Sequence, residues 1–173
     1  MKIISKQIIY EGFYKLYKVT VDAEGNKLER ELFDTGPAVG VLLFDTIKQC
    51  YILIKQYRMP IDKPMLEIVA GLYDHPEESL EEAVCREVEE ETGYAVDQIY
   101  PIASYYSSPG AFAEKLHLFY AEVSHKKSAG GGLAEEYEHI ETIEVNPQDL
   151  SALEIEDGKT LVAVQWAQLN KAK

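Results

Sequence analysis

Few cysteines and only short apolar runs set the first limits on what this sequence can be. Its 173 residues include two cysteines, Cys50 and Cys85, which form no CxxC pair. We therefore expect neither a disulfide framework nor a cysteine-held metal, and interpret Cys85 as a small buried hydrophobe within a helix. Runs such as 39–44 and 51–54 are too short to span a membrane, and residues 1–12 do not resemble a signal peptide. These absences predict a cytoplasmic protein without membrane association.

The chain also lacks the basic surplus that a binder of nucleic-acid polymers usually needs. It has 17 lysines and arginines against 30 aspartates and glutamates, a formal net charge of −13. With 46% hydrophobic and 27% charged residues, the composition is typical of a globular chain. Net acidity alone indicates little beyond solubility. The positions of the acidic residues therefore carry more information than their number.

Hydrophobic periodicity predicts a β-rich α+β or α-β-α domain. Residues 94–106 are expected to form strand and loop, and the glycine-rich segment 124–133 a flexible loop. Strands are expected, with a break near residues 11–12, over 2–21, 27–33, 38–45, 49–57, 65–70, 116–123 and 140–145.

Two helices are expected. The first spans 80–92, because Ser79 and Glu82 form a capping-box pattern before it and Gly93 stands at its end. The second spans 160–170 and has an amphipathic pattern. Its expected core residues are Leu161, Val164, Trp166 and Leu169.

The inward-facing stripe of the helix at 80–92 changes from apolar to acidic. On a helical projection Glu87 and Glu91 fall within the stripe and Glu90 at its edge. Burying unpaired carboxylates this close together is costly, and a hard cation such as Mg²⁺ removes the conflict. The alternative is a solvated acidic face, which suits Glu82 and Glu89 better. The apolar part of the stripe consists of Leu80, Ala83, Val84 and Val88.

These residues resemble the Nudix box. Gly71, Glu78 and the run 86–94 (REVEEETGY) follow the family's order and spacing, except that six residues rather than five separate Gly71 from Glu78. We interpret the extra residue as an insertion in the turn at 74–76. The resemblance implies a Nudix fold over 37–173, an α-β-α sandwich with a mixed sheet. It also implies that residues 1–36 form a β extension that two subunits of a homodimer exchange.

The same resemblance implies site residues. Arg86, counted with the catalytic residues, would pair with Glu78 and orient the helix. Glu67 would be a substrate or outer-shell carboxylate, and Glu90 would be both metal-binding and catalytic. Two or three Mg²⁺ ions, or Mn²⁺ in their place, would be held by Ala70 (through its carbonyl), Glu87, Glu90 and Glu91.

Outside the box, residues 8–170 are similar to ADP-ribose pyrophosphatases and the related GDP-mannose pyrophosphatases. The run from Ser108 to Gly110, about 15 residues after the box, is typical of enzymes that act on nucleoside-diphosphate sugars; a simple turn is the alternative. Glu114 then falls where these enzymes place a residue near the sugar. Arg58 matches a substrate-binding arginine, or else is a surface arginine of a strand.

Residues from a second subunit also enter this resemblance. Phe13 and Arg30 would stack on the nucleobase from the partner chain, with a core aromatic and a surface arginine as the alternatives. In the acidic segment 134–140, Glu136 would be the general base and Glu138 its helper. The alternative is a solvated charge run.

Several functions stay open at this point. The favoured one is hydrolysis of ADP-ribose to AMP and ribose 5-phosphate, supported by the segments 133–140 and 155–169. GDP-mannose is the chief alternative substrate, because residues 129–132 (AGGG) resemble the GDP-mannose enzymes. Weaker alternatives are a non-catalytic nucleotide-sugar sensor and removal of damaged nucleotides such as 8-oxo-dGTP.

Overall fold

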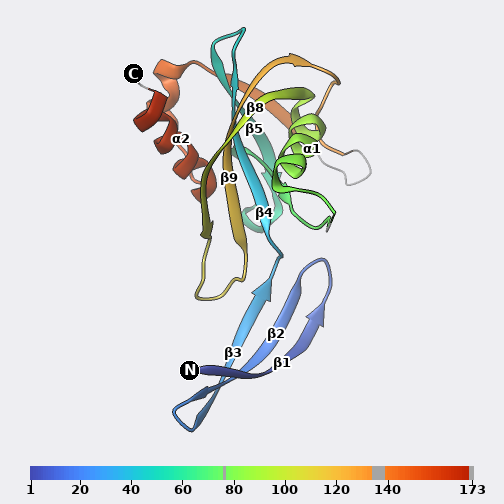
Figure 1. The fold of residues 1–173 in the computed structure, drawn as a ribbon, viewed down its shortest axis with the longest axis vertical. Coiled ribbons are helices and arrows are strands. Elements are labelled where there is room, and N and C mark those ends of the chain that lie inside the picture. The colour runs from blue at the N-terminus through green and yellow to red at the C-terminus, as the bar shows by residue number, and fades with distance from the viewer. Residues whose placement is uncertain (76, 134–138, 172–173) are drawn as a thin grey trace.

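An antiparallel meander of three strands forms one end of the molecule (Figure 1). The computed structural model describes residues 1–75, 77–133 and 139–171, except the side chain of Lys171. The meander consists of β1 (Lys2–Glu11), β2 (Lys15–Ala23) and β3 (Asn26–Asp34). Every residue of β1 is exposed, so this sheet has little core of its own. It is joined to the rest of the chain where Phe33 exchanges backbone hydrogen bonds with Ala111 and Ala113.

The larger sheet contains seven strands within the described residues. Its central order is β10 (Ile140–Val145), β5 (Cys50–Arg58), β4 (Ala38–Asp45), β9 (Lys115–Lys126) and β8 (Tyr94–Tyr106). Strands β4 and β9 run parallel, whereas the other pairs are antiparallel. The predicted mixed sheet is therefore confirmed.

The two remaining strands replace the single strand expected over 65–70. β6 (Lys63–Glu67) pairs with β5, and β7 (Val69–Leu72) pairs with β4. The chain changes partner at Ile68, whose N–H donates to the Thr160 hydroxyl at 2.8 Å. A short helix, η1 (Met59–Ile61), links β5 to β6.

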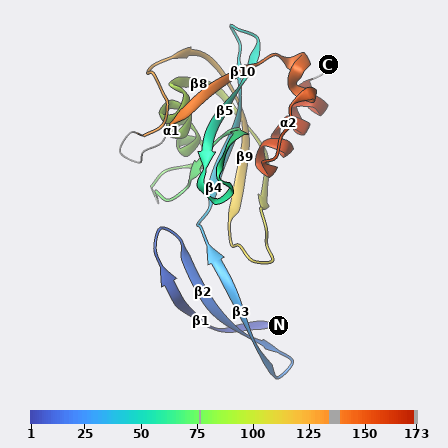
Figure 2. The ribbon, with the colours of Figure 1, turned by 180° about the vertical axis from the view of Figure 1, so that it is seen from behind.

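Helices α1 (Leu80–Thr92) and α2 (Gly158–Lys171) cover opposite faces of this sheet (Figure 2). Alternate residues of β4 point to the two helices: Val41 and Leu43 belong to the core with α1, and Leu42 to the core with α2. A short helix, η3 (Pro147–Ala152), precedes α2. The predicted α-β-α sandwich is thus confirmed. No helix in the described part of the chain is long and apolar enough to cross a membrane.

The prediction for α1 is confirmed to its ends, but two expectations about helix faces are wrong. Both halves of the Ser79–Glu82 capping box form, and Gly93 ends the helix with a φ of 76°. Cys85 is exposed, because it lies off the buried stripe. In α2, Leu161 and Leu169 are exposed. The residues buried against the sheet are the small ones Thr160, Ala163, Val164 and Ala167.

Two expectations about loops are also wrong. Residues 94–106 form one continuous strand, whose irregular register with β9 includes bulges. The segment 124–133 is not simply a flexible loop: β9 continues to Lys126, and Gly131 and Gly132 donate backbone hydrogen bonds to α1. Partners distant in sequence supply the order that the glycines themselves cannot.

Candidate active site

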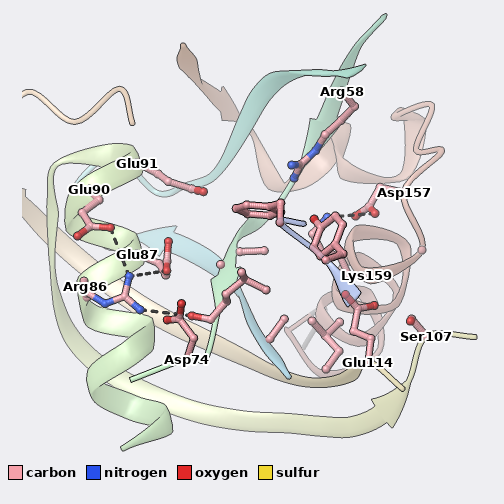
Figure 3. A pocket seen from close by; sticks show the side chains of 18 of the residues that line it. Arg58, Asp74, Arg86, Glu87, Glu90, Glu91, Ser107, Glu114, Asp157 and Lys159 are labelled. Carbon is pink, nitrogen blue, oxygen red and sulfur yellow. Dashed lines mark hydrogen bonds and ion pairs between the residues drawn. The ribbon is translucent and has the colours of Figure 1, made fainter. Parts of the chain in front are cut away.

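A cavity of about 880 Å³ lies between α1, the start of α2 and the turn joining β1 to β2. This volume is typical of a small-molecule pocket. Figure 3 shows carboxylates of α1 at one side and Asp157, Lys159 and Glu114 at the other. The cavity therefore brings together segments from most of the chain.

The first wall carries the carboxylates of Glu87, Glu90 and Glu91 from the last two turns of α1. Glu87 and Glu91 are buried, as the helical projection predicted. Beside them β7 contributes Ala70 and Gly71. A Cβ added at Gly71 would overlap the Glu87 carboxylate. The glycine therefore makes room for an inward-facing acid.

Arg86 holds this wall together. Its Nε and Nη2 donate to the two carboxylate oxygens of Glu78 at 3.1 and 3.2 Å, so the expected ion pair forms. Nη1 donates to Glu87 at 2.6 Å and to Glu90 at 3.4 Å. Burial acts to lower the pKa of Arg86, but Glu78 and Glu87 outweigh it and raise the pKa. Arg86 thus fixes α1 to the preceding loop and reduces repulsion between the acids.

The donor atoms of this wall fit a hard divalent cation. Carboxylate oxygens and a backbone carbonyl are the ligands that Mg²⁺ and Mn²⁺ accept, and the space that Gly71 leaves is filled by one of these carboxylates. Across residues 1–75, 77–133 and 139–171, no three acidic, histidine or cysteine side chains converge as a preformed metal cage. Arg86 draws Glu87 and Glu90 toward itself, whereas Glu91 points into the cavity (Figure 3).

The second wall carries two cations, Arg58 and Lys159, which share one buried acid, Glu67. Arg58 donates to both Glu67 oxygens, at 2.6 and 2.7 Å, and Lys159 donates to Oε2. Burial acts to raise the pKa of Glu67, but Arg58 and Lys159 outweigh it and hold the pKa below its ordinary value. Arg58 and Lys159 line the cavity, while Glu67 is 1% exposed and lies behind them. Glu67 thus positions two cations.

Lys159 was missed in the sequence. It stands in the first turn of α2, where the Asp157 carboxylate accepts from the Thr160 N–H at 2.9 Å and pairs with Lys159 at 3.1 Å. The signal was the Asp-x-x-Thr cap, whose aspartate lies three residues before the predicted start of the helix. A lysine at a helix N-terminus that borders a cavity provides a site for an anion.

Tyr105 was also missed. It lines the cavity, and its hydroxyl oxygen is buried with no hydrogen-bond partner among the described residues. Burial raises the pKa of this phenol, and the charges of Asp157 and Glu114 add to the effect. The protonated hydroxyl is available to a polar group of a ligand.

Of the other expected substrate residues, Glu114 lines the cavity, whereas Ser108 and Gly110 do not. Ser107, the neighbour of Ser108, also lines it. Ser108 and Gly110 belong to the exposed turn between β8 and β9. The turn is closed where the Ser108 carbonyl accepts from the N–H groups of Ala111 and Phe112.

Of the two residues expected from a partner chain, Phe13 lines the cavity and Arg30 does not. Phe13 is 83% exposed and lines the cavity of its own chain. Arg30 is exposed on β3 and donates to the Glu29 carbonyl at 2.7 Å. The expected base Glu136 and its helper Glu138 lie outside the described residues. The Ile140 N–H donates to the Gly131 carbonyl at 3.0 Å, close to the end of α1.

The fold is an α-β-α sandwich with a mixed sheet, and its acidic helix begins and ends where the Nudix box requires. Together these two features define a Nudix-type hydrolase. The model of the NUDIX domain family matches residues 34–166, and the chain belongs to that family. The predicted enzyme class, a Nudix pyrophosphatase, is confirmed.

Similar proteins cover nearly the whole chain. A GDP-mannose pyrophosphatase of Yersinia enterocolitica is 34% identical over 96% of this chain and 94% of its own. A GDP-mannose pyrophosphatase of Enterobacter sp. (strain 638) is 31% identical over 98% and 96%. A crystal structure of an ADP compounds hydrolase matches with a TM-score of 0.82 over 98% and 94% of the two chains, at 20% identity, and shows the same fold.

Proposed function

We propose that this protein hydrolyses the pyrophosphate bond of a nucleoside-diphosphate sugar in a reaction that depends on Mg²⁺. One observation carries the proposal: a single cavity has a carboxylate wall on α1 and, in the opposite wall, the two cations Arg58 and Lys159. A diphosphate is suited to lie between them, because divalent cations join it to the acids and the opposite wall attracts its remaining charge.

In this proposal Glu87, Glu90, Glu91 and the Ala70 carbonyl hold two or three Mg²⁺ ions, with Mn²⁺ as a substitute. Bound there, the cations neutralise the diphosphate and lower the pKa of an attacking water. Arg86 keeps Glu87 and Glu90 in place. Glu136 accepts a proton from the water and Glu138 supports it.

The rest of the cavity receives the two ends of the substrate. Glu114 and the buried hydroxyl of Tyr105 offer hydrogen-bonding partners to the sugar, and Ser108 and Gly110, in the exposed turn after β8, would contact it when it is bound. Phe13 offers an exposed aromatic face to a nucleobase. Lys159 and Arg58 bind phosphate oxygens.

The relatives that are 31–34% identical support GDP-mannose as the leading substrate. ADP-ribose, favoured from the sequence, is the second candidate. Its support is the segment 133–140 and the tail 155–169, which resemble ADP-ribose pyrophosphatases.

We also propose a homodimer that forms through the N-terminal sheet. β1 exposes a row of large apolar side chains, and such a surface is typical of an interface. Arg30 would reach the nucleobase of the other subunit. Light scattering after size exclusion should give twice the chain mass, and Ile9→Glu should give the single mass; a monomeric wild type would remove this part of the proposal. The exposed apolar residues are Ile3, Ile4, Ile8, Ile9 and Tyr10.

The decisive test is phosphate release, after coupling to a phosphatase, from GDP-mannose, ADP-ribose, UDP-glucose and 8-oxo-dGTP, with Mg²⁺ or EDTA. The expected result is Mg²⁺-dependent turnover of a diphosphate sugar. The variant Glu91→Gln, purified by the same procedure, controls for contaminating enzymes. Preference for 8-oxo-dGTP would contradict the substrate class. No turnover, with binding of a diphosphate sugar, would favour the sensor alternative.

A further inference from the structure

The three glycines at 130–132 pack on the C-terminal end of α1. The Gly132 N–H donates to the Glu90 carbonyl at 3.1 Å, and the Gly131 N–H donates to the Glu91 carbonyl at 2.8 Å. In the same direction, the Gly93 carbonyl accepts from the N–H groups of residues 127 and 128 at 2.7 and 3.2 Å. We call residues 130–132 the glycine clamp.

Steric fit explains why these positions are glycine. All three have positive φ angles, between 67° and 104°, a region that other residues rarely adopt. A Cβ at Gly130 would also overlap the backbone of Thr92 and Gly93, whereas one at Gly131 would meet no atom closer than 3.9 Å. Gly130 is therefore the point of closest contact between the clamp and α1.

Electrostatics give the clamp a second role. The last turns of a helix carry unsatisfied carbonyls and a partial negative charge. Here they also carry Glu89, Glu90 and Glu91, and the last turn contains no basic residue. The N–H groups of Gly131 and Gly132 place partial positive charge at the backbone of Glu90 and Glu91, two of the residues that line the cavity.

We propose that the glycine clamp is a positioning element that sets the affinity of the site for divalent cations. It fixes the backbone of Glu90 and Glu91 through hydrogen bonds, and residues 130–132 are not among the residues that line the cavity, which the next residue, Leu133, does line. The inference rests on the proposed metal site of α1. It predicts that displacing the clamp weakens cation binding while the fold persists.

A matched pair of variants separates this role from ordinary backbone strain. Gly130→Ala places an alanine at an unfavourable positive φ, and its Cβ would also overlap α1. Gly25→Ala also places an alanine at a positive φ, 88°, but no atom lies within 4 Å of its Cβ. Gly25 lies in the turn between β2 and β3, in the N-terminal sheet. Both variants are compared with the wild-type chain by titration with Mn²⁺, using the electron paramagnetic resonance signal of the free ion.

The expected result is a Kd for Mn²⁺ raised about tenfold or more in Gly130→Ala, as for loss of other groups that orient metal ligands, and an unchanged Kd in Gly25→Ala. Circular dichroism verifies that each variant is folded. Wild-type affinity in folded Gly130→Ala overturns the clamp proposal and leaves the proposed function intact. Absence of Mn²⁺ binding by the wild type overturns both.

Hydrogen exchange on the wild-type chain tests the proposal even if Gly130→Ala does not fold. Addition of Mg²⁺ should slow exchange at the amides of Gly131 and Gly132 together with those at the end of α1, because the two are hydrogen-bonded. Slower exchange in α1 with no change at Gly131 and Gly132 would show that the clamp does not respond to the metal, and would overturn the proposal.

Discussion

Gly71 and Glu87 are in contact across the cavity wall, with no room for a side chain between the Gly71 Cα and the Glu87 carboxylate. The contact joins β7 to α1. It gives a physical reason for the glycine of the Nudix box: because Gly71 has no side chain, the Glu87 carboxylate can occupy the space beside it.

Gly71→Ala should therefore displace the Glu87 carboxylate. A shift of about 1 Å in an active-site group can cost roughly 100-fold in rate, and we expect a loss of this size in kcat/KM for the best substrate. A double-mutant cycle checks the cause, because Gly71→Ala should cost far less in a Glu87→Ala background. Equal losses in both backgrounds would mean that the methyl group acts elsewhere.

Glu91→Gln should nearly abolish turnover without unfolding the chain. The amide keeps the shape of the side chain but weakens a divalent-cation site, and the metal contributes several kcal/mol to the transition state, about 10³-fold in rate. Glu89→Gln on the same helix is the control, since Glu89 is half-exposed and pairs with Lys127. Near-normal Mg²⁺-dependent activity of Glu91→Gln would remove Glu91 from the metal site.

Lys159→Met should raise KM about tenfold and change kcat less. The ammonium group of Lys159 attracts phosphate oxygens in both the bound substrate and the transition state. Its removal therefore weakens the binding of both to a similar extent. Lys63→Met is the control, because Lys63 forms an exposed ion pair with Glu156. Steady-state kinetics at two salt concentrations tests this, and a KM that does not change would exclude Lys159 from substrate binding.

Local signals explain which parts were predictable. The capping box, the glycine after the last turn and the 3.6-residue period all lie within 79–93, and α1 was predicted to its ends. The Nudix box includes the three carboxylates of this helix that line the cavity, so the first wall could be identified from the same short stretch.

Long-range pairings explain what was missed. Glu67 and Lys159 are 92 residues apart, and nothing near either one indicates the other. The clamp was interpreted as a flexible loop because its hydrogen-bond partners belong to a helix some 40 residues earlier. In α2 two large apolar residues that were expected inside, Leu161 and Leu169, are exposed, and the helix turns small side chains such as Ala163 to the sheet. Tertiary packing decided each case.

Glu136→Gln should lower kcat by about 100-fold and change KM little, if Glu136 is the general base. Glu141→Gln is the control, because Glu141 is an exposed carboxylate of β10. The pH dependence of kcat should also lose its acidic limb in Glu136→Gln. An unchanged kcat would assign proton abstraction to another group.

Glu67→Gln should destabilise the protein and make its stability less dependent on pH. The amide leaves Arg58 and Lys159 without their shared counter-charge, and because Arg58 is partly exposed we expect a loss of about 2 kcal/mol near neutral pH. The pKa of Glu67 is lower in the folded chain than its ordinary 4.5. Its stabilisation is therefore complete above that value and is lost as the pH falls below it toward the folded pKa.

Urea denaturation of the wild type and of Glu67→Gln, each in EDTA, measures this difference as a function of pH. The gap in the free energy of unfolding should be largest near neutral pH and should close in acid. A gap that persists unchanged below pH 4.5 would show that the negative charge of Glu67 does not account for the stabilisation. In that case Arg58 and Lys159 would not need this acid to hold their positions at the cavity wall.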